Sequence, residues 1–170
     1  MASTLTVDTI QGSTNADNVK LPKGCIVQVE QFLQTGAAGN FTGQSLATIQ
    51  SATFTDVMNK SITTKFANSK IFVQIGIAGY TGTSGNGLRA NARLLRDATE
   101  INYDQYAFYG YSSVIYRYQS NVIDAPAAAA GTVLNYKLQM RKSGGENFGI
   151  GYADSAGRTE ATLTLMEIVQ

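Results

Sequence analysis

Within residues 132–142, apolar and polar side chains alternate from position 134 to position 141. Leu134, Tyr136, Leu138 and Met140 fall on one side, and Asn135, Lys137, Gln139 and Arg141 fall on the other. Successive side chains of a β-strand point to opposite faces of a sheet. The pattern therefore predicts a strand with one face on a hydrophobic core and the other face in water.

The stretch from Glu160 to Val169 starts with the same alternation and then changes. Apolar residues first take every second position, at Ala161, Leu163 and Leu165, and then occupy both faces, at Met166, Ile168 and Val169. A strand that is apolar on both faces is normally covered on both faces. A single sandwich covers only one of them, so we expect a neighbouring subunit to cover the other.

The rest of the body reads as short strands separated by turns. The predicted strands cover residues 25–33, 60–66, 71–77, 88–96, 100–103, 111–119 and 148–152. Residues 46–59 fit either a short helical turn or an edge strand. Roughly eight to ten short strands without a long helix are typical of an antiparallel sandwich. The sequence predicts an all-β fold, an antiparallel β-sandwich of the jelly-roll kind.

The first 24 residues differ from the body. Leu5, Val7 and Ile10 form one short apolar segment, and polar turn residues follow it. Such a segment cannot bury a core of its own, so it is either disordered or lies on another molecule. We expect residues 1–24 to be an extended N-terminal anchoring arm and residues 25–170 to be a β-sandwich knob.

Composition mainly excludes classes of function. The chain has 13 Lys and Arg against 12 Asp and Glu, so charge gives no reason to expect nucleic acid or a membrane surface as a partner. The absence of His removes Ser–His–Asp and Cys–His catalytic units and the commonest zinc ligand. Cys25 is the single cysteine, so no disulfide forms within the chain, and we expect its thiol to be buried.

The remaining chemical features favour structural roles. Asp97, Glu100 and Asp104 cluster near one turn, but their spacing supports neither a catalytic carboxylate pair nor a cation site. The glycine-rich residues 81–87 lack the Gly-Lys-Ser/Thr ending of a phosphate-binding loop. No apolar run could span a bilayer, and residues 1–11 do not resemble a signal peptide. We expect no enzyme activity, no cofactor, no metal site and no membrane insertion, and assembly in a cytoplasm.

Tyrosine is concentrated in one part of the chain. Six of the nine tyrosines are Tyr103, Tyr106, Tyr109, Tyr111, Tyr116 and Tyr118. A tyrosine has a large apolar face and a polar tip, which suits wet interfaces and contacts with sugars or proteins. Three interpretations stay open: ordinary strand residues, a subunit interface, or a surface that binds glycan, with Tyr106 and Tyr109 as the contacts.

The order of several short motifs resembles a family of virion proteins. The motifs are STLTVDTIQG, LPKGCIVQV, SKIFVQIGIAG, LLRDATEI, NYKLQMRKSGG and TLTLMEIV, in this order along the chain. They resemble small virion proteins of marine and freshwater tailed bacteriophages, including cyanophage structural proteins and tail-fibre ends. The globular part of that family is similar to the trimeric jelly roll of the complement and tumour-necrosis-factor type.

The resemblance implies a homotrimer and no catalytic residue. It places the final strand near the three-fold axis, with Leu163, Leu165, Met166 and Ile168 in the trimer interface. Leu5, Val7 and Ile10 would then anchor the arm to another virion protein, either the major capsid protein or a tail or fibre protein. Because the chain has no repeats that could form a shaft, we favour a capsid decoration or cement protein on the virion surface. The alternative is a tail-fibre or adhesin tip, or a fibre adaptor, that binds a host surface glycan.

Overall fold

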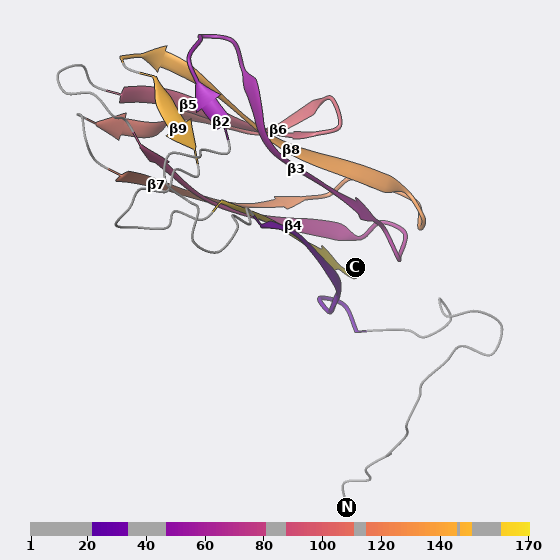
Figure 1. Cartoon of the computed structure of the whole chain (residues 1–170). Helices are drawn as coiled ribbons and strands as arrows, with labels where there is room; N and C mark the ends of the chain where they lie inside the picture. The colour runs from indigo at the N-terminus through magenta and orange to yellow at the C-terminus, as the bar shows by residue number, and fades with distance from the viewer. Residues whose placement is uncertain (1–21, 34–46, 81–87, 111–114, 146, 151–160) are drawn as a thin grey trace, which may run out of the picture.

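The computed structural model describes residues 22–33, 47–80, 88–110, 115–145, 147–150 and 161–170. These residues form strands that lie in two facing layers (Figure 1). The strands are β1 (Ile26–Leu33), β2 (Ala47–Ile49), β3 (Thr55–Thr63), β4 (Lys70–Tyr80), β5 (Leu88–Arg96), β6 (Thr99–Gly110), β7 (Ile115–Asp124), β8 (Val133–Gly144), β9 (Phe148–Ile150) and β10 (Thr162–Ile168).

The strand order is that of a jelly roll. Sheet I has the order β1-β10-β4-β7, and the short strands β9 and β2 continue it beside the far end of β4. Sheet II has the order β3-β8-β5-β6. All neighbouring strands are antiparallel. Without the short strands β2 and β9, the remaining eight strands form two four-stranded sheets with long crossovers, which is the double Greek key of a jelly roll. The predicted all-β, antiparallel, jelly-roll-like sandwich is confirmed.

The core lies between the sheets and follows the alternation in the sequence. The inner residues of β8 are at most 5% exposed, and they are Leu134, Tyr136, Leu138 and Met140. The inner residues of β4 are at most 3% exposed, and they are Ile71, Val73, Ile75 and Ile77. Full burial of one large apolar side chain contributes roughly 1.5–3 kcal/mol. The two strands therefore supply much of the apolar layer that holds the sheets together.

A buried polar cluster also joins the two sheets. The Tyr136 hydroxyl donates to Oδ2 of Asp124 at 2.6 Å, and Nη1 of Arg96 lies 2.7 Å from both oxygens of the same carboxylate. Asp124, at the end of β7 in sheet I, is 8% exposed, while Tyr136 and Arg96 belong to sheet II. Burial and the bond to Asp124 raise the pKa of Tyr136 above its ordinary value.

Strand β10 carries a buried carboxylate. Glu167 is 0% exposed and accepts hydrogen bonds from the backbone N–H groups of Lys65 and Phe66, at 2.9 and 3.0 Å, and from Nε2 of Gln28, at 2.6 Å. A charge removed from water needs such donors to be tolerated. Glu167 thereby fixes the turn between β3 and β4 against β10. The alternation in the sequence did not predict an acidic residue on the inner face.

Several local predictions can now be compared with the structure. Residues 46–59 form no helix in their described part: β2 and β3 lie there, and β3 is an edge strand of sheet II. The prediction of a buried thiol is wrong, because Cys25 lies just before the edge strand β1 and is partly exposed. Most of the predicted arm, residues 1–21, lies outside the described residues. Within the described part of the chain, no helix is long and apolar enough to cross a bilayer.

Candidate binding surfaces

The residues predicted for the trimer interface divide between the two faces of β10. Leu163 and Leu165 are 0% exposed and pack in the core of the single chain. Met166 and Ile168 point to the outer face of sheet I, where they are only partly buried. Leu163 and Leu165 are already covered by sheet II, so any contact with another subunit would fall to Met166 and Ile168.

The outer face of sheet I carries an apolar row that crosses four strands. The paired residues of this apolar row are Val29 on β1, Met166 on β10, Phe72 on β4 and Ile123 on β7. Val29 is 55% exposed and Ile123 is 62% exposed, although both are large apolar residues. A continuous apolar surface on a soluble protein commonly marks an interaction site.

An uncharged polar row runs beside the apolar row. It consists of Gln31, Thr164, Gln74 and Asn121, paired across the same four strands. Next to it, a shallow hollow of about 200 Å³ is lined by Gly76, Ala78, Gln119, Thr162 and the charged Arg117. A side chain on Gly76 would come within 3.0 Å of Oγ1 of Thr162, so glycine keeps this part of the face low. The combination of an apolar row, amides and a hollow suits contact with another protein surface.

The exposed rings of the tyrosine-rich segment lie mainly on β6, which is an edge strand of sheet II. Tyr103, Tyr106 and Tyr109 are 40%, 48% and 58% exposed. Tyr118 is instead 8% exposed and donates its hydroxyl to the carboxylate of Asp104, and its burial raises its pKa. The segment thus contains both ordinary core residues and exposed rings. Tyr111 lies outside the described residues.

A bulge in β6 sets the positions of the exposed rings. Ala90 pairs with Phe108 and Ala92 with Asp104, so residues 105–107 of β6 all lie opposite Asn91. Asn91 is 3% exposed, and its side chain donates to the Tyr103 hydroxyl at 2.8 Å and accepts from the Tyr106 N–H at 3.4 Å. Bulges re-aim side chains and interrupt strand edges. Here the bulge turns Tyr106 outward, with a φ of 66°.

Phe54 packs on two guanidinium groups of sheet II. Cζ of Arg93 and Cζ of Arg141 lie 4.0 and 4.7 Å from the centre of the Phe54 ring. The ring of Tyr103 meets Phe54 edge-on, with the ring centres 6.4 Å apart. A cation–π contact at an exposed site contributes about 0.5–1 kcal/mol. These contacts restrain both arginines on the outer face of sheet II.

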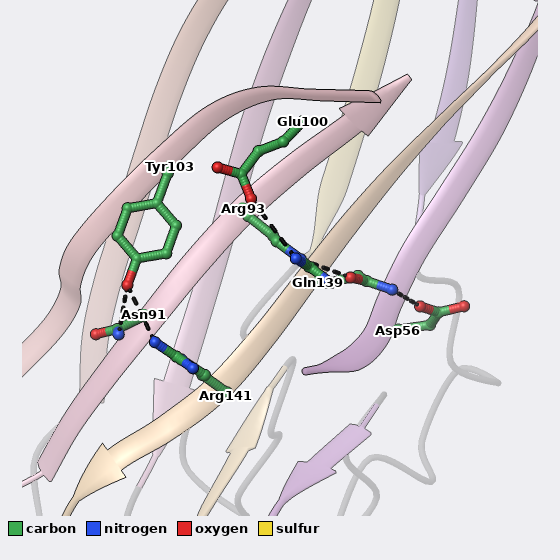
Figure 2. Close-up of polar contacts among 7 residues, drawn as sticks. All are labelled: Asp56, Asn91, Arg93, Glu100, Tyr103, Gln139 and Arg141. Carbon is green, nitrogen blue, oxygen red and sulfur yellow. Dashed lines mark hydrogen bonds and ion pairs between the residues drawn. The ribbon is translucent and has the colours of Figure 1, made fainter. Parts of the chain in front are cut away.

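Polar contacts extend this network across sheet II (Figure 2). Nε of Arg93 donates to Gln139 at 2.8 Å, and Nε2 of Gln139 donates to Asp56 at 2.5 Å. Arg93 also lies 3.6 Å from the carboxylate of Glu100. The hydrogen bonds from Gln139 and Lys137 hold the pKa of Asp56 below its ordinary value.

The three carboxylates predicted to cluster near the 97–99 turn have separate partners. Glu100 faces Arg93, Asp104 accepts from Tyr118, and Asp97 accepts from the backbone N–H of Asn135 at 3.2 Å. Among the residues the structure describes, no group of three or more His, Cys, Asp or Glu side chains could hold a metal ion. The arrangement of these carboxylates is that of separate structural contacts.

Sequence reasoning missed three residues of the sheet II surface: Phe54, Asn91 and Arg141. Phe54 precedes β3 and reaches Arg93 only because β3 and β5 lie on the two sides of β8. Asn91 reaches both Tyr103 and Tyr106 because of the bulge in β6, and no pattern in β5 reveals a bulge in another strand. The alternation of β8 places Arg141 on the outer face, but it does not reveal which residues Arg141 contacts.

Comparisons with known proteins identify no family. No family model matches the sequence, and no curated protein matches it. Among solved structures, the VP2 subviral particle of infectious bursal disease virus aligns with a TM-score of 0.48 and 12% identity, over 85% of this chain and 34% of that chain. This chain therefore spans about a third of the VP2 chain.

Two other solved structures have different descriptions. Dimeric latent PorU from Porphyromonas gingivalis aligns with a TM-score of 0.47 and 8% identity, over 89% of this chain and 14% of that chain. The Stig cyclase Fisc from Fischerella sp. TAU aligns with a TM-score of 0.43 and 14% identity, over 91% of this chain and 83% of that chain. At such scores these likenesses carry no conclusion about function.

Proposed function

We propose that this chain is a non-enzymatic structural protein of a bacteriophage virion. In this proposal it forms a homotrimeric knob on the virion surface, and its N-terminal arm binds the major capsid protein, so that it decorates or cements the capsid. The order of the sequence motifs supports the virion setting, and the jelly roll agrees with the knob that the resemblance implies. The observation that carries the proposal is the exposed apolar row on the outer face of sheet I.

The apolar row is suited to another copy of the same chain. Neither the apolar row nor the uncharged polar row contains a charged residue, so covering the two rows desolvates no charge within them. The nearest charged residues on this face are Lys70, which pairs with Ile168, and Arg117, which lines the hollow. Closed homo-oligomers of identical chains are the commonest assemblies of soluble proteins. In a three-fold arrangement, the row of each copy would pack on a neighbour, and the hollow beside Gly76 would receive a side chain of that neighbour.

The test is the mass of the purified protein in sedimentation equilibrium. We expect a mass near three chains at micromolar concentration, and we expect the double variant Val29→Asp/Ile123→Asp to sediment as a folded monomer. These two residues lie on edge strands and are more than half exposed, so the fold itself should tolerate the change. The matched control is Tyr109→Asp, which places a carboxylate at an equally exposed position on sheet II and should leave the mass unchanged.

A monomer of the unaltered protein would contradict the proposed assembly. So would a double variant that keeps the mass of the unaltered protein, because the apolar row would then play no part in the contact. Deletion of residues 2–20, which include Leu5, Val7 and Ile10, tests the arm separately. The truncated protein should stay trimeric but fail to join virions, and normal incorporation would show that the arm is not the anchor.

A second candidate function is recognition, as a tail-fibre or adhesin tip, or a fibre adaptor, that binds a host surface glycan. The observation that favours it is the fixed, exposed pair Tyr106 and Tyr109, whose ring centres are 5.6 Å apart. The number of copies in a purified virion separates the two functions. Hundreds of copies would support capsid decoration, and a few tens or fewer would support a place on the tail.

A further inference from the structure

The exposed edge of sheet II has both aromatic faces and cations that lack a carboxylate partner. Tyr109 pairs with Arg89 across β5 and β6, and Cζ of Arg89 lies 5.7 Å from the centre of its ring. Arg141 pairs with Asn91 across β8 and β5, and its Nη2 donates to the Tyr103 hydroxyl at 3.4 Å. The two arginines therefore flank the tyrosines on the same surface.

The positive charges of this surface are only partly neutralised. Arg93 has Glu100 as a partner, and Lys137 lies 2.9 Å from Asp56. Arg89 and Arg141 form no ion pair with any residue that the structure describes. An anionic group would therefore complement this edge better than a neutral one.

The aromatic side chains are held in place before any ligand binds. Asn91 fixes the Tyr103 hydroxyl and the backbone of Tyr106, and Tyr106 packs edge-on against Tyr109. Phe54 also restrains Arg141, because Cζ of Arg141 lies 4.7 Å from the centre of the Phe54 ring. Side chains that are already ordered lose little conformational entropy on binding, which favours even a shallow surface as a binding site.

We propose that Arg89, Tyr106, Tyr109, Tyr103 and Arg141 form a binding site for an acidic saccharide. The apolar face of a sugar ring packs on Tyr106 and Tyr109, and carboxylate or sulfate groups of the saccharide accept hydrogen bonds from the guanidinium groups of both Arg89 and Arg141. The inference rests on the recognition alternative of the proposed function and specifies its ligand class.

A single-stranded nucleic acid also combines rings with negative charge, but the observations favour a saccharide. Nucleic acid carries a charge on every nucleotide, and proteins that bind it without sequence preference do so through a positively charged groove. The net charge of this chain is only +1, and Glu100 and Asp56 lie on the same face. A polymer with fewer, more widely spaced acidic groups meets less repulsion there.

The experiment is a calorimetric titration of the full chain with defined oligosaccharides, in which the heat of binding is measured. The probes are a short oligogalacturonate, its fully methyl-esterified form, a sulfated dextran oligosaccharide and an oligothymidylate of similar length. We expect binding of at least one acidic saccharide, weakening as NaCl is raised, and no measurable binding of the neutral ester. Three results would each overturn the proposal. They are a failure of both acidic saccharides to bind, binding of the ester as tight as that of its acid form, and tighter binding of the oligothymidylate than of the acidic saccharides.

Substitutions of the proposed site residues test whether the saccharide binds at this edge of sheet II. Arg141→Gln and Arg89→Gln should each raise the dissociation constant about ten-fold, the loss expected for one charge-assisted contact. Tyr106→Ala/Tyr109→Ala should do the same, whereas Arg141→Lys should retain part of the affinity. Lys65→Gln removes one exposed positive charge elsewhere and is the matched control, which should bind like the unaltered protein. Equal losses in the control and the arginine variants would show non-specific attraction and overturn the site.

The same preparations separate this inference from the proposed assembly. Sedimentation of each variant reports the oligomer, and the titration reports the ligand. A correct trimer without saccharide binding would reject only the ligand site. Saccharide binding by a monomer would support the site while rejecting the assembly through sheet I.

Discussion

The two sheets of this jelly roll share one core but present opposite kinds of outer face. Sheet I turns outward the apolar row and the uncharged polar row, and both ends of the apolar row are exposed. Sheet II turns outward arginines, carboxylates and tyrosines that are already joined to one another (Figure 2). The difference indicates that one face is suited to permanent burial and the other to contact in water.

The cost of desolvation explains why the outer face of sheet I, and not that of sheet II, is suited to burial against another subunit. Removing an ion from water costs several kcal/mol, which a new partner must offset with well-placed charges and donors. Covering the network around Arg93 would carry this cost, whereas covering the row around Phe72 would not. Hydrophobic burial contributes about 25 cal/mol for each Å² of apolar surface removed from water. Association through sheet I is therefore favoured over association through the middle of sheet II.

The largest expected difference between the two faces of sheet I comes from substituting neighbouring residues of β10, one facing the core and one facing outward. Leu165→Asp places an unpaired charge in the core, and we expect it to unfold the chain, since even Leu→Ala in a core costs about 2–5 kcal/mol. Met166→Asp should leave the fold intact and only dissociate the proposed trimer. Circular dichroism melting and sedimentation of both variants measure these effects. If both variants stay folded, Leu165 is not part of the core as described.

A smaller effect is expected where the core joins the two sheets. Tyr136→Phe removes the hydroxyl that donates to Asp124, and we expect a loss of about 1–3 kcal/mol in the free energy of unfolding at neutral pH. Because this site lies inside the sandwich, the variant should associate through sheet I and bind ligand on sheet II like the unaltered protein until it unfolds. Urea denaturation with the unaltered protein as reference measures the loss.

The same tyrosine predicts a dependence on alkaline pH. The pKa values of Tyr136 and Tyr118 are raised above the ordinary value of 10.0 in the folded protein, so the folded state keeps protons that the unfolded state releases. The corresponding stability is complete below about pH 10 and is lost as the pH rises above that value. Denaturation at pH 8 and near pH 11 should show the decline, and Tyr136→Phe should make it shallower. A pH-independent stability over this range would contradict the buried hydrogen bonds.

The smallest effect is expected on the outer face of sheet II. The lowered pKa of Asp56 means that its contribution is present above the ordinary carboxyl pKa and is lost as the pH falls through the lower, folded value. Its side chain is 52% exposed, so solvent screens the contacts, and Asp56→Asn should cost less than about 1 kcal/mol. Asp124→Asn, at a buried position, is the comparison and should cost more. Chemical denaturation of both variants at neutral pH measures the difference.

The sequence predicted the fold more fully than the surfaces, for a physical reason. Alternation within one strand decides which residues face the core, and Tyr136 and Ile75 could be placed inside from that pattern alone. A surface depends on which strands become neighbours, and this pairing joins Val29 to Met166 and Phe72 to Ile123 across distant parts of the chain. The predicted interface combines Leu163 and Leu165, which are buried in the core of the single chain, with Met166 and Ile168, which lie on the outer face.

The central place of β10 has a consequence for how the chain folds. Strand β10 lies between β1 and β4, and Glu167 bonds Gln28 across a separation of 139 residues. Contacts between such distant segments form only after a large loop closes, and folds dominated by them fold slowly, in milliseconds to seconds. Until β10 arrives, β1 has no neighbour in sheet I, and the backbone N–H groups of residues 65 and 66 lack their acceptor. A chain interrupted before residue 162 should therefore expose the edge of β4 and aggregate rather than form a smaller stable sandwich.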